Sequence, residues 1–326
     1  MKASDLLTRD EIERLTEASD LRGALSVLVD WGLIAACFAL VAVLPVDGPG
    51  FAAALAHPLT VGVALVGIGG RQLGLAILMH ECAHRSLFRT RWLNDVVGVW
   101  LCAAPVWGDV DRYRVHHRKH HVHTGTAEDP DLGLVTPFPT TRRGLVRKLL
   151  RDVTGLAALR RIVGLLAMDL GFVEYTASTA AVRRPPMSAG ARLRLGVRNL
   201  GPVVVTNGAL LGILTAVGHP ALYLLWVGAW CTTYSVVLRI RSIAEHACTE
   251  PTLDPLRNTR TTAVSWPTRL VLAPHHVSYH LEHHLLMTVP HWRLPAMHRV
   301  LRERGVFGPH NHAPGYLAVL RGVVSS

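Results

Sequence analysis

Three clusters of histidine have the spacing that a metal site built on helices requires. Their members are His80 and His84 (H-x-x-x-H), His117, His120 and His121 (H-x-x-H-H), and His280, His283 and His284 (H-x-x-H-H). Positions i, i+3 and i+4 share one face of a helix, so each cluster can direct two or three imidazoles to one point. Eight such imidazoles are more than a mononuclear site needs. The sequence therefore predicts a polynuclear metal centre, which we interpret as two irons at the edge of a membrane.

The first cluster also matches a different signature. His80-Glu81-Cys82-Ala83-His84 has the form H-E-x-x-H, in which zinc peptidases use the glutamate as a general base. A mononuclear hydrolase needs three protein ligands and one open position. It would leave most histidines of the other two clusters unexplained. A zinc intramembrane metalloprotease is the alternative from a different functional class.

Long apolar runs organise the rest of the chain, in which half of the residues are hydrophobic. The runs predict four spanning helices, over residues 25–46, 51–79, 201–217 and 221–240. About twenty residues cover the roughly 30 Å of a hydrocarbon core. Pro and Gly predict tight turns at 45–50 and 218–220. The spans therefore form two hairpins.

The second and fourth spans each deliver a histidine at a similar height. His80 follows Arg71 by nine residues, and His246 follows Arg239 by seven. At 1.5 Å per residue these distances are about 13 Å and about 10 Å beyond the arginines that mark the membrane interface. The sequence thus places His246 at the height of the metal centre.

The distribution of basic residues predicts the orientation. The two predicted turns contain no Lys or Arg, whereas several arginines lie close to the other ends of the spans. These are Arg71, Arg85, Arg89, Arg198, Arg239 and Arg241. The positive-inside rule then makes both termini and all histidine clusters cytoplasmic. The net charge of +11 favours an anionic lipid surface or an acidic redox partner over nucleic acid, because the basic residues flank apolar runs.

Four shorter segments carry weaker expectations. Ser4 is a candidate cap for a short amphipathic helix near the N-terminus. Residues 96–107 are too short to span, which predicts a buried or interfacial segment, and residues 124–141 predict a loop. Residues 152–175 predict an amphipathic helix that lies either along the membrane interface or against the cytosolic domain. The five cysteines are expected to be reduced thiols.

The three clusters and their surroundings resemble the membrane fatty acid desaturase and hydroxylase superfamily, in particular its acyl-lipid desaturases. The resemblance covers about residues 25 to 305. Beyond the histidine boxes it includes Glu128-Asp129-Pro130-Asp131, Arg241-Ser242-Ile243-Ala244-Glu245-His246 and Leu294-Pro295-Ala296-Met297-His298-Arg299.

The resemblance implies an all-α membrane protein with four transmembrane helices and a cytosolic helical cap that holds a di-metal centre. It implies three regions: a cytosolic amphipathic segment (1–23), the desaturase-like domain (24–305) and a C-terminal tail (306–326). The implied metal ligands are His80, His84, His117, His120, His121, His246, His280, His283 and His284.

Seven further residues are candidates for a metal or supporting role. Many relatives have Asn where this chain has His276, which can ligate, contact a metal through water or form a hydrogen bond. Ser242 is a weak ligand that a water can replace. The carboxylates that can orient imidazole N–H groups are Glu81, Glu245, Glu282, Asp129 and Asp131; both aspartates are equally suited to capping a helix.

The reaction implied by the resemblance is the oxygen-dependent introduction of a double bond into a lipid acyl chain. Its cofactors are two Fe²⁺ ions, with O2 as co-substrate and a separate ferredoxin-, rubredoxin- or cytochrome-type electron donor. Basic residues near the second box can dock that donor: Arg112, Arg114, Arg118 and Lys119. A hydroxylase of the same superfamily, acting on a fatty acyl, sphingolipid or carotenoid chain, is the first alternative. The expected location is a bacterial-type inner membrane.

Overall fold

The computed structural model describes residues 1–43, 51–178 and 181–325 and is predominantly helical. In this part of the chain, four helical segments are long and apolar enough to cross a membrane. They are α2 (Asp20–Val43), α3 (Phe51–His84), α9 (Ala189–Ala216) and the consecutive pair α10 (Tyr223–Cys231) and α11 (Thr233–His246). The prediction of four spanning segments is confirmed in their number, length and composition.

The bounds of the spans differ from the prediction: α2 begins at Asp20 and not at residue 25, α3 continues to His84 and not to residue 79, and the third and fourth spans differ more. Helix α9 begins twelve residues before residue 201, at Ala189, where the Ser188 hydroxyl accepts a hydrogen bond from the Ala191 amide. The early turns carry arginines, which favour helix but interrupt an apolar run, so hydropathy alone misses them. The fourth span breaks at Thr232 (φ −115°, ψ −85°) and then continues to His246.

The break allows a close crossing between α11 and α3. The Thr233 hydroxyl donates to the Leu65 carbonyl of α3 at 2.6 Å. A Cβ atom on Gly69 would lie 2.2 Å from that hydroxyl, so only glycine fits at this contact. The two helices that end in histidines are therefore packed directly against each other.

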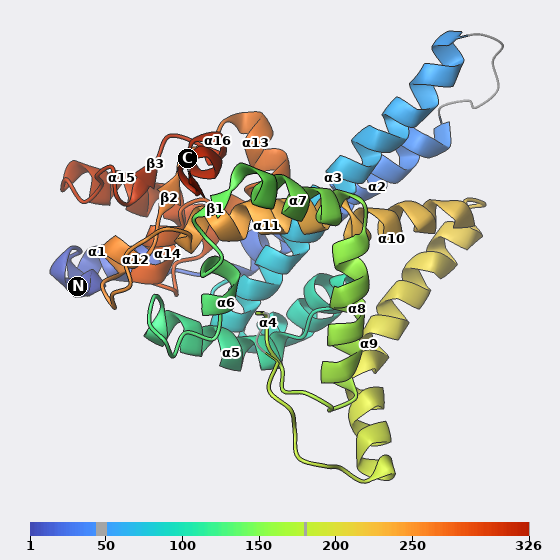
Figure 1. The fold of residues 1–326 in the computed structure, drawn as a ribbon, viewed down its shortest axis with the longest axis horizontal. Coiled ribbons are helices and arrows are strands. Elements are labelled where there is room, and N and C mark those ends of the chain that lie inside the picture. The colour runs from blue at the N-terminus through green and yellow to red at the C-terminus, as the bar shows by residue number, and fades with distance from the viewer. Residues whose placement is uncertain (44–50, 179–180, 326) are drawn as a thin grey trace.

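Both hairpin tips point to the same side of the molecule, and both termini lie on the other side (Figure 1). The turn predicted at 218–220 is confirmed: Gly218 has φ +83°, and the amides of Gly218 and His219 bond back to the carbonyls of Thr215 and Leu214. The turn predicted at 45–50 lies outside the described residues.

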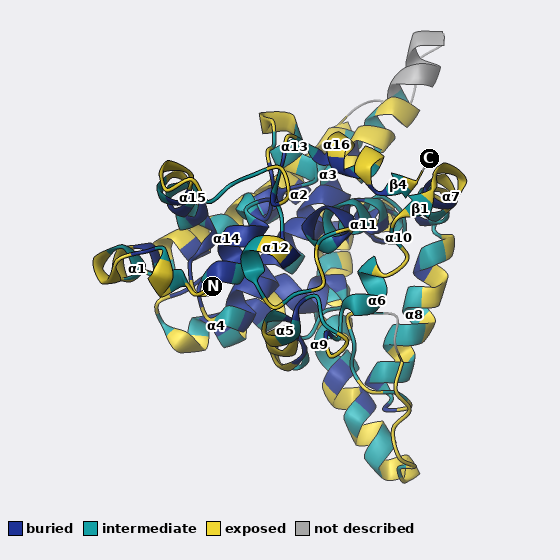
Figure 2. Cartoon of the chain, turned by 60° about the vertical axis from the view of Figure 1, so that its left-hand side comes forward, coloured by how far each residue is buried: buried dark blue, intermediate teal, exposed yellow. Residues whose placement is uncertain are grey.

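Helix α3 is the centre of the fold. Ile68, Leu73, Leu75 and Leu78 are fully buried among α2, α10, α11 and the segment that follows α4. Buried residues concentrate around α3, α11 and α14, whereas α8 is mostly half-buried or exposed (Figure 2). The rigid centre of the molecule thus leads straight into the first histidine pair.

A buried ion pair joins the first hairpin. Arg71 on α3 donates to Asp30 on α2 at 2.9 Å, and His275 lies 2.8 Å from the other oxygen of that carboxylate. Gly74 leaves room for Asp30, since a Cβ there would be 2.4 Å from the carboxylate. Charged groups inside a spanning hairpin are costly unless paired, and here each has a partner.

Shorter helices make up most of the rest of the described chain. Those before α9 are η1 (Ala3–Asp5), α1 (Arg9–Leu15), α4 (Arg91–Val97), the π-helical η2 (Gly98–Ala103), η3 (Ala104–Val106), α5 (Val110–His123), α6 (Leu132–Val135), α7 (Arg142–Val153) and α8 (Leu156–Asp169). Those after α9 are η4 (Pro220–Leu222, at a hairpin tip), α12 (Pro255–Asn258), α13 (Trp266–Val271), η5 (Pro274–His276), α14 (His280–Leu285), η6 (His291–Arg293), α15 (Leu294–Glu303) and α16 (Tyr316–Gly322).

Two parallel two-residue strand pairs fasten the C-terminal residues to this body. Strand β1 (Thr140–Thr141) pairs with β4 (Val324–Ser325), and β2 (Thr261–Thr262) pairs with β3 (His312–Ala313). Tyr316 is buried in the main core. The residues that the sequence sets apart as a tail from 306 onward therefore pack on the rest of the chain.

The expectations for the shorter segments have mixed outcomes. The prediction that Ser4 caps the N-terminal helix is wrong: Thr8 caps α1 in a capping box with Glu11, and Ser4 lies in η1. In residues 96–107, the stretch from Cys102 to Val106 is buried, as expected. The loop predicted over 124–141 contains the one-turn helix α6 and the strand β1. All five cysteines are free thiols.

The amphipathic helix is shorter than predicted and the first half of its apolar stripe is uncovered. Gly155 (φ +77°) separates α7 from α8, so the helix covers Leu156–Asp169 and not 152–175. Leu156, Leu159 and Val163 of the predicted stripe are all exposed. This first half of the stripe is uncovered, whereas Leu170 at its far end packs against Gly196 of α9. The uncovered half favours the membrane interface over the alternative.

Candidate metal centre

The structure brings the nine histidines proposed as ligands together in two groups. The first group is His80, His84, His117, His121 and His283, and the second is His120, His246, His280 and His284. In each group, one ring nitrogen from every member lies within 4.8 Å of the others. The first box and His246 come from the ends of α3 and α11, and the other two boxes come from α5 and α14.

Helical periodicity divides each H-x-x-H-H box between the two groups. On α5, His117 and His121 are one turn apart and face the first group, while His120 is rotated into the second. On α14, His280 and His284 face the second group and His283 the first. Each of these two boxes therefore contributes to both groups, which fixes the groups side by side.

The nitrogen–nitrogen distances fit ligands of a shared ion better than hydrogen bonds. The Nε2 atoms of His80 and His121 lie 2.8 Å and 3.0 Å from Nε2 of His117, and His121 is also 3.0 Å from His283. A neutral imidazole has only one N–H, so such a chain of contacts cannot be satisfied by protons alone. Two nitrogens at right angles around a metal, each about 2.1 Å from it, are roughly 3.0 Å apart.

The second group has the same geometry. His246 Nε2 lies 2.8 Å from His280 Nε2 and 3.3 Å from His120 Nε2. Nε2 of His84 in the first group and Nε2 of His284 in the second are buried and have no hydrogen-bond partner. Buried polar atoms without a partner are rare in proteins. One such nitrogen in each group, among the other converging ring nitrogens, fits a cation bound in each group.

Burial keeps these imidazoles in the form that binds metal. Desolvation, helped by neighbouring histidines, lowers the pKa of His117, His121, His280, His283 and His284 far below the ordinary value. These rings are neutral at pH 7, with a lone pair available for coordination.

Asp129 and Glu245 support ligands of the second group. His120 Nδ1 donates to Asp129 Oδ1 at 2.8 Å, which orients Nε2 of that ring toward the group. Burial raises the pKa of Asp129, but the hydrogen bond and charge of His120 outweigh it, so the pKa falls below the ordinary value. Glu245 lies 3.4 Å from His280 Nδ1 and is paired with Arg241. Asp131 lies 2.8 Å from His116 Nε2 and 3.9 Å from His120.

The other two glutamates hold the backbone around the centre. Glu81 accepts from the amide of His291 at 2.9 Å and lies 3.9 Å from His80 Nδ1. Glu282 accepts from Thr261 and contacts His298 at 2.5 Å, so it ties α14 to β2 and α15 and does not touch a ligand. Because Glu81 is held by the His291 amide, it is not placed as the free base of an H-E-x-x-H peptidase.

His276 and Ser242 lie outside both groups. His276 has a left-handed backbone (φ +58°), and its ring stacks 5.8 Å from His291. Its Nδ1 is buried without a partner, and burial lowers its pKa to about 4. Ser242 lines the cavity described below.

Sequence reasoning missed several supporting groups. His246 Nδ1 donates to the backbone carbonyl of Asn258 at 3.0 Å, a contact that no residue pattern can predict. Tyr113 stacks on His117 at 4.9 Å, and here the spacing of four residues on one helix was an available signal. Among the residues predicted to dock the electron donor, Arg112 is paired with Asp109 and Asp169, and Arg114 with Asp95 and Asp111.

A cavity of about 1060 Å³ opens onto both groups. His80, His117, His120, His246 and His280 line it at the metal centre. Away from the centre its wall includes apolar and aromatic side chains of α8, α10 and α11, among them Leu165, Trp230, Tyr234 and Leu238. The cavity therefore combines a larger apolar surface with many charged and polar side chains, among them Asp109, Arg160 and Arg241. A concave site of this kind is typical of a binding site for a small molecule or a lipid chain.

Comparisons with known proteins agree with this site. Residues 54–315 match the family described as fatty acid desaturase. A dihydrorhizobitoxine desaturase of Bradyrhizobium elkanii is 26% identical over 84% of this chain and 74% of its own. A beta-carotene ketolase of a Paracoccus species is 28% identical over 84% of this chain and 92% of its own.

An sn-1 acyl-lipid omega-3 desaturase (ferredoxin) of a Nostoc species is 26% identical over 68% of this chain and 61% of its own. The names of these relatives point to oxidoreductase activity. The family match covers most of the chain, including every histidine of the two groups, and the chain belongs to the fatty acid desaturase family.

Proposed function

We propose that this protein is a membrane di-iron desaturase that introduces a double bond into a lipid acyl chain in an oxygen-dependent reaction. One observation carries the proposal: two adjacent histidine groups, one of five residues and one of four, open onto the same largely apolar cavity. Catalytic zinc sites use three protein ligands, and structural zinc sites are almost always four-coordinate. A five-histidine group beside a second site of four therefore favours iron over a single zinc.

The two irons would supply the activation of O2, and the overall reaction converts CH2–CH2, O2, two electrons and two protons to CH=CH and two waters. The protein's own part is to hold the nine imidazoles in a fixed orientation and to present one segment of the acyl chain to them. Asp129 and Glu245 fix the orientation of His120 and His280. The apolar part of the cavity wall, including Leu165 and Leu238, would align the acyl chain.

The membrane arrangement belongs to the same proposal. Four apolar helical segments anchor the protein, and we place the shorter helices and the histidine groups on the cytoplasmic side of a bacterial-type inner membrane, as a cap over the spans. An acyl chain can then enter from the lipid.

The electrons come from a separate donor. The Nostoc relative's name supports a ferredoxin-type protein, with rubredoxin and cytochrome types as alternatives. Arg118 and Lys119 are exposed and form no ion pair among the described residues, so they are the part of the basic patch that remains available.

A hydroxylase or ketolase of the same superfamily is the second candidate. The Paracoccus beta-carotene ketolase matches this chain over 92% of its own length, so the two proteins have a similar extent. Such an enzyme would use the same centre and insert oxygen instead of removing two hydrogens.

Expression in a host with simple lipids, followed by mass spectrometry of the lipids, tests the proposal. A desaturase gives products lighter by two hydrogens, and a hydroxylase gives products heavier by one oxygen. The iron-loaded protein should hold about two irons per chain, as expected for two adjacent sites. A single tightly bound zinc with no activity after iron loading would refute the proposal. Full activity in the His120→Ala and His283→Ala variants would refute the assignment of the centre.

A further inference from the structure

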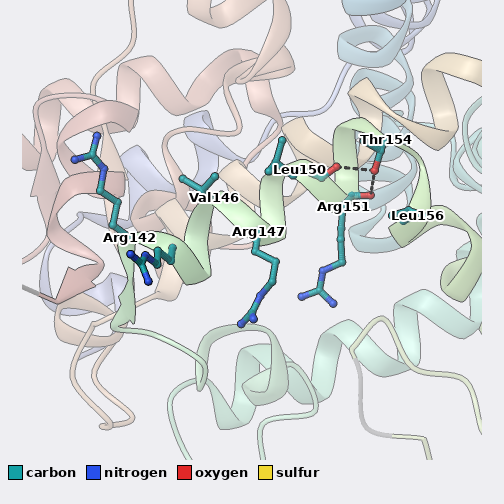
Figure 3. A pocket seen from close by; sticks show the side chains of 8 residues that line it. Arg142, Val146, Arg147, Leu150, Arg151, Thr154 and Leu156 are labelled. Carbon is teal, nitrogen blue, oxygen red and sulfur yellow. Dashed lines mark hydrogen bonds between the residues drawn. The ribbon is translucent and has the colours of Figure 1, made fainter.

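Helix α7 carries an open groove whose wall is rich in arginine. Arg142, Arg143, Arg147 and Arg151 line it, together with the apolar side chains of Val146, Leu150 and Leu156. Figure 3 shows Arg147 and Arg151 extending side by side from one face of the helix, as their spacing of four residues requires. The groove therefore combines paired guanidinium groups with exposed apolar surface.

None of these four guanidinium groups forms an ion pair or a side-chain hydrogen bond with any residue that the structure describes. The nearest acid on the helix, Asp152, is buried and is paired with Arg239 at 2.9 Å. Burial and the neighbouring Arg239, Arg151 and Arg147 also lower the pKa of Lys148. The positive charge along α7 is thus concentrated and unbalanced within the protein.

The groove adjoins the cavity of the candidate metal centre. Arg151 and Leu156 line both, and Lys148 and Asp152 line the cavity just beyond. Arg239, the partner of Asp152, lies seven residues before His246 on α11, which is about 10 Å along the helix. A molecule with an anionic head at α7 could therefore extend an apolar chain from Arg151 to the histidines.

The position of α7 indicates where such a molecule comes from. Val146, Leu150 and Val153 are exposed on α7, and the exposed stripe of α8 (Leu156, Leu159, Val163) follows directly. Helix α8 runs beside α9, one of the four apolar segments (Figure 1). Exposed leucine and valine interleaved with arginine are typical of an amphipathic segment at an anionic membrane surface. A docking site for an acidic soluble protein would not need the apolar residues.

We propose that the α7 groove is the head-group site for an anionic phospholipid whose acyl chain enters the cavity. Arginine suits this task because its planar guanidinium binds phosphate through two parallel hydrogen bonds. The role of that lipid as substrate rests on the proposed function, whereas the binding of its phosphate to α7 does not. The site distinguishes lipids by their charge, so phosphatidylglycerol is favoured over phosphatidylcholine with the same acyl chains.

Native mass spectrometry of the full-length protein in non-ionic detergent tests the binding, with titrations of phosphatidylglycerol and phosphatidylcholine. The double substitution Arg147→Gln and Arg151→Gln should weaken phosphatidylglycerol binding by about 30-fold, since each charge near an anionic surface contributes about fivefold. The matched control is Arg299→Gln with Arg302→Gln, two exposed arginines on α15 that form no ion pair with a described residue. It should bind phosphatidylglycerol as the unmodified protein does.

A charge-conserving variant, Arg147→Lys with Arg151→Lys, separates binding from folding and should retain most of the affinity. Equal affinity for both lipids, or equal losses in the α7 and α15 variants, would overturn the proposal. Tighter binding of an acyl-CoA thioester than of phosphatidylglycerol, through the same arginines, would also overturn the proposal. The bound phosphate would then belong to a soluble acyl carrier and not to a membrane lipid. A variant that slows reduction by ferredoxin with unchanged lipid binding would assign the groove to the electron donor and also overturn it.

Desaturase activity is measured on the same samples. Lipid binding that depends on α7, in an iron-loaded protein without activity, would support the groove and count against the proposed function. Equal activity on phosphatidylglycerol and phosphatidylcholine, with no effect of the α7 variants, would support the proposed function and count against the head-group site at α7.

Discussion

Removal of the Asp129 carboxylate should loosen one metal position while leaving the histidines in place. Asp129 is buried and accepts a hydrogen bond from His120 Nδ1 at 2.8 Å. It also accepts the amides of Asp131 and Gly125, which fixes the carboxylate in the loop after α5. The substitution Asp129→Ala leaves His120 without the acceptor that sets its tautomer and ring orientation.

The expected magnitude follows from the role of such partners in other metal sites. Loss of a carboxylate that orients a ligating histidine typically costs 10- to 100-fold in metal affinity or activity, or about 1.4–2.8 kcal/mol. Asp129→Ala should fall near the upper limit, since no acceptor remains. Asp129→Asn should fall near the lower limit, since its amide oxygen can still accept from Nδ1 but carries no charge.

The assay is iron retention against a graded chelator, with the iron content measured per chain. Because His120 belongs to the second group, the variant should lose iron in two stages, the first at a lower chelator concentration than in the unmodified protein. Asp111→Asn is the control, because that carboxylate is exposed and pairs with Arg114. Unchanged iron retention in Asp129→Ala, or an equal effect of Asp111→Asn, would refute the supporting role of Asp129.

Two further predictions concern the cavity and the spanning hairpin. Gly164 lines the cavity and has no atom within 4 Å of its position for a Cβ, so Gly164→Leu should project into that space and shorten the acyl chain that is accepted. The product profile from lipids of different chain length measures this, and Gly212→Leu on α9, which has equally open surroundings, should leave the profile unchanged. Asp30→Asn should destabilise the protein by about 3–5 kcal/mol, because it leaves Arg71 buried without its counter-charge. Thermal unfolding in detergent tests this, and Glu13→Gln, which breaks an exposed pair, should change stability by no more than about 1 kcal/mol.

The sequence was most informative where helical periodicity alone determines which residues lie together. The spacing within each box identified eight histidines, and the helical rise after Arg239 identified His246; the structure places all nine in the two groups. Periodicity separates the members of each H-x-x-H-H box, but it does not predict which histidines of different helices meet in one group. Which ones meet depends on how α3, α5, α11 and α14 cross, and those crossings depend on contacts such as Gly69 with Thr233.

The same limit explains the residues that sequence reasoning left open. His276 lies four residues before His280, a separation that would place both on one face of a continuous helix. The backbone instead turns at His275 and His276, both with positive φ, and a helix begins again only at His280. His276 therefore points to His291. Hydropathy likewise missed the first turns of α9, because their arginines interrupt the apolar run, and the break at Thr232, because a change in backbone angles leaves the polarity of the segment unchanged.

The unequal size of the two histidine groups bears on where the acyl chain meets the centre. The first group has five imidazoles, of which two line the cavity (His80 and His117). The second has four, of which three line it (His120, His246 and His280). The group with fewer ligands is thus also the one that faces the cavity more fully. If metal ions occupied both groups, the four-histidine group would supply fewer imidazoles on the side of the cavity, whereas the five-histidine group is better shielded. The carboxylates that contact ligands most directly, Asp129 and Glu245, also support the four-histidine group. The four-histidine group thus has fewer imidazoles and the carboxylate contacts of Asp129 and Glu245. We expect the reacting carbons of the acyl chain to lie beside this group.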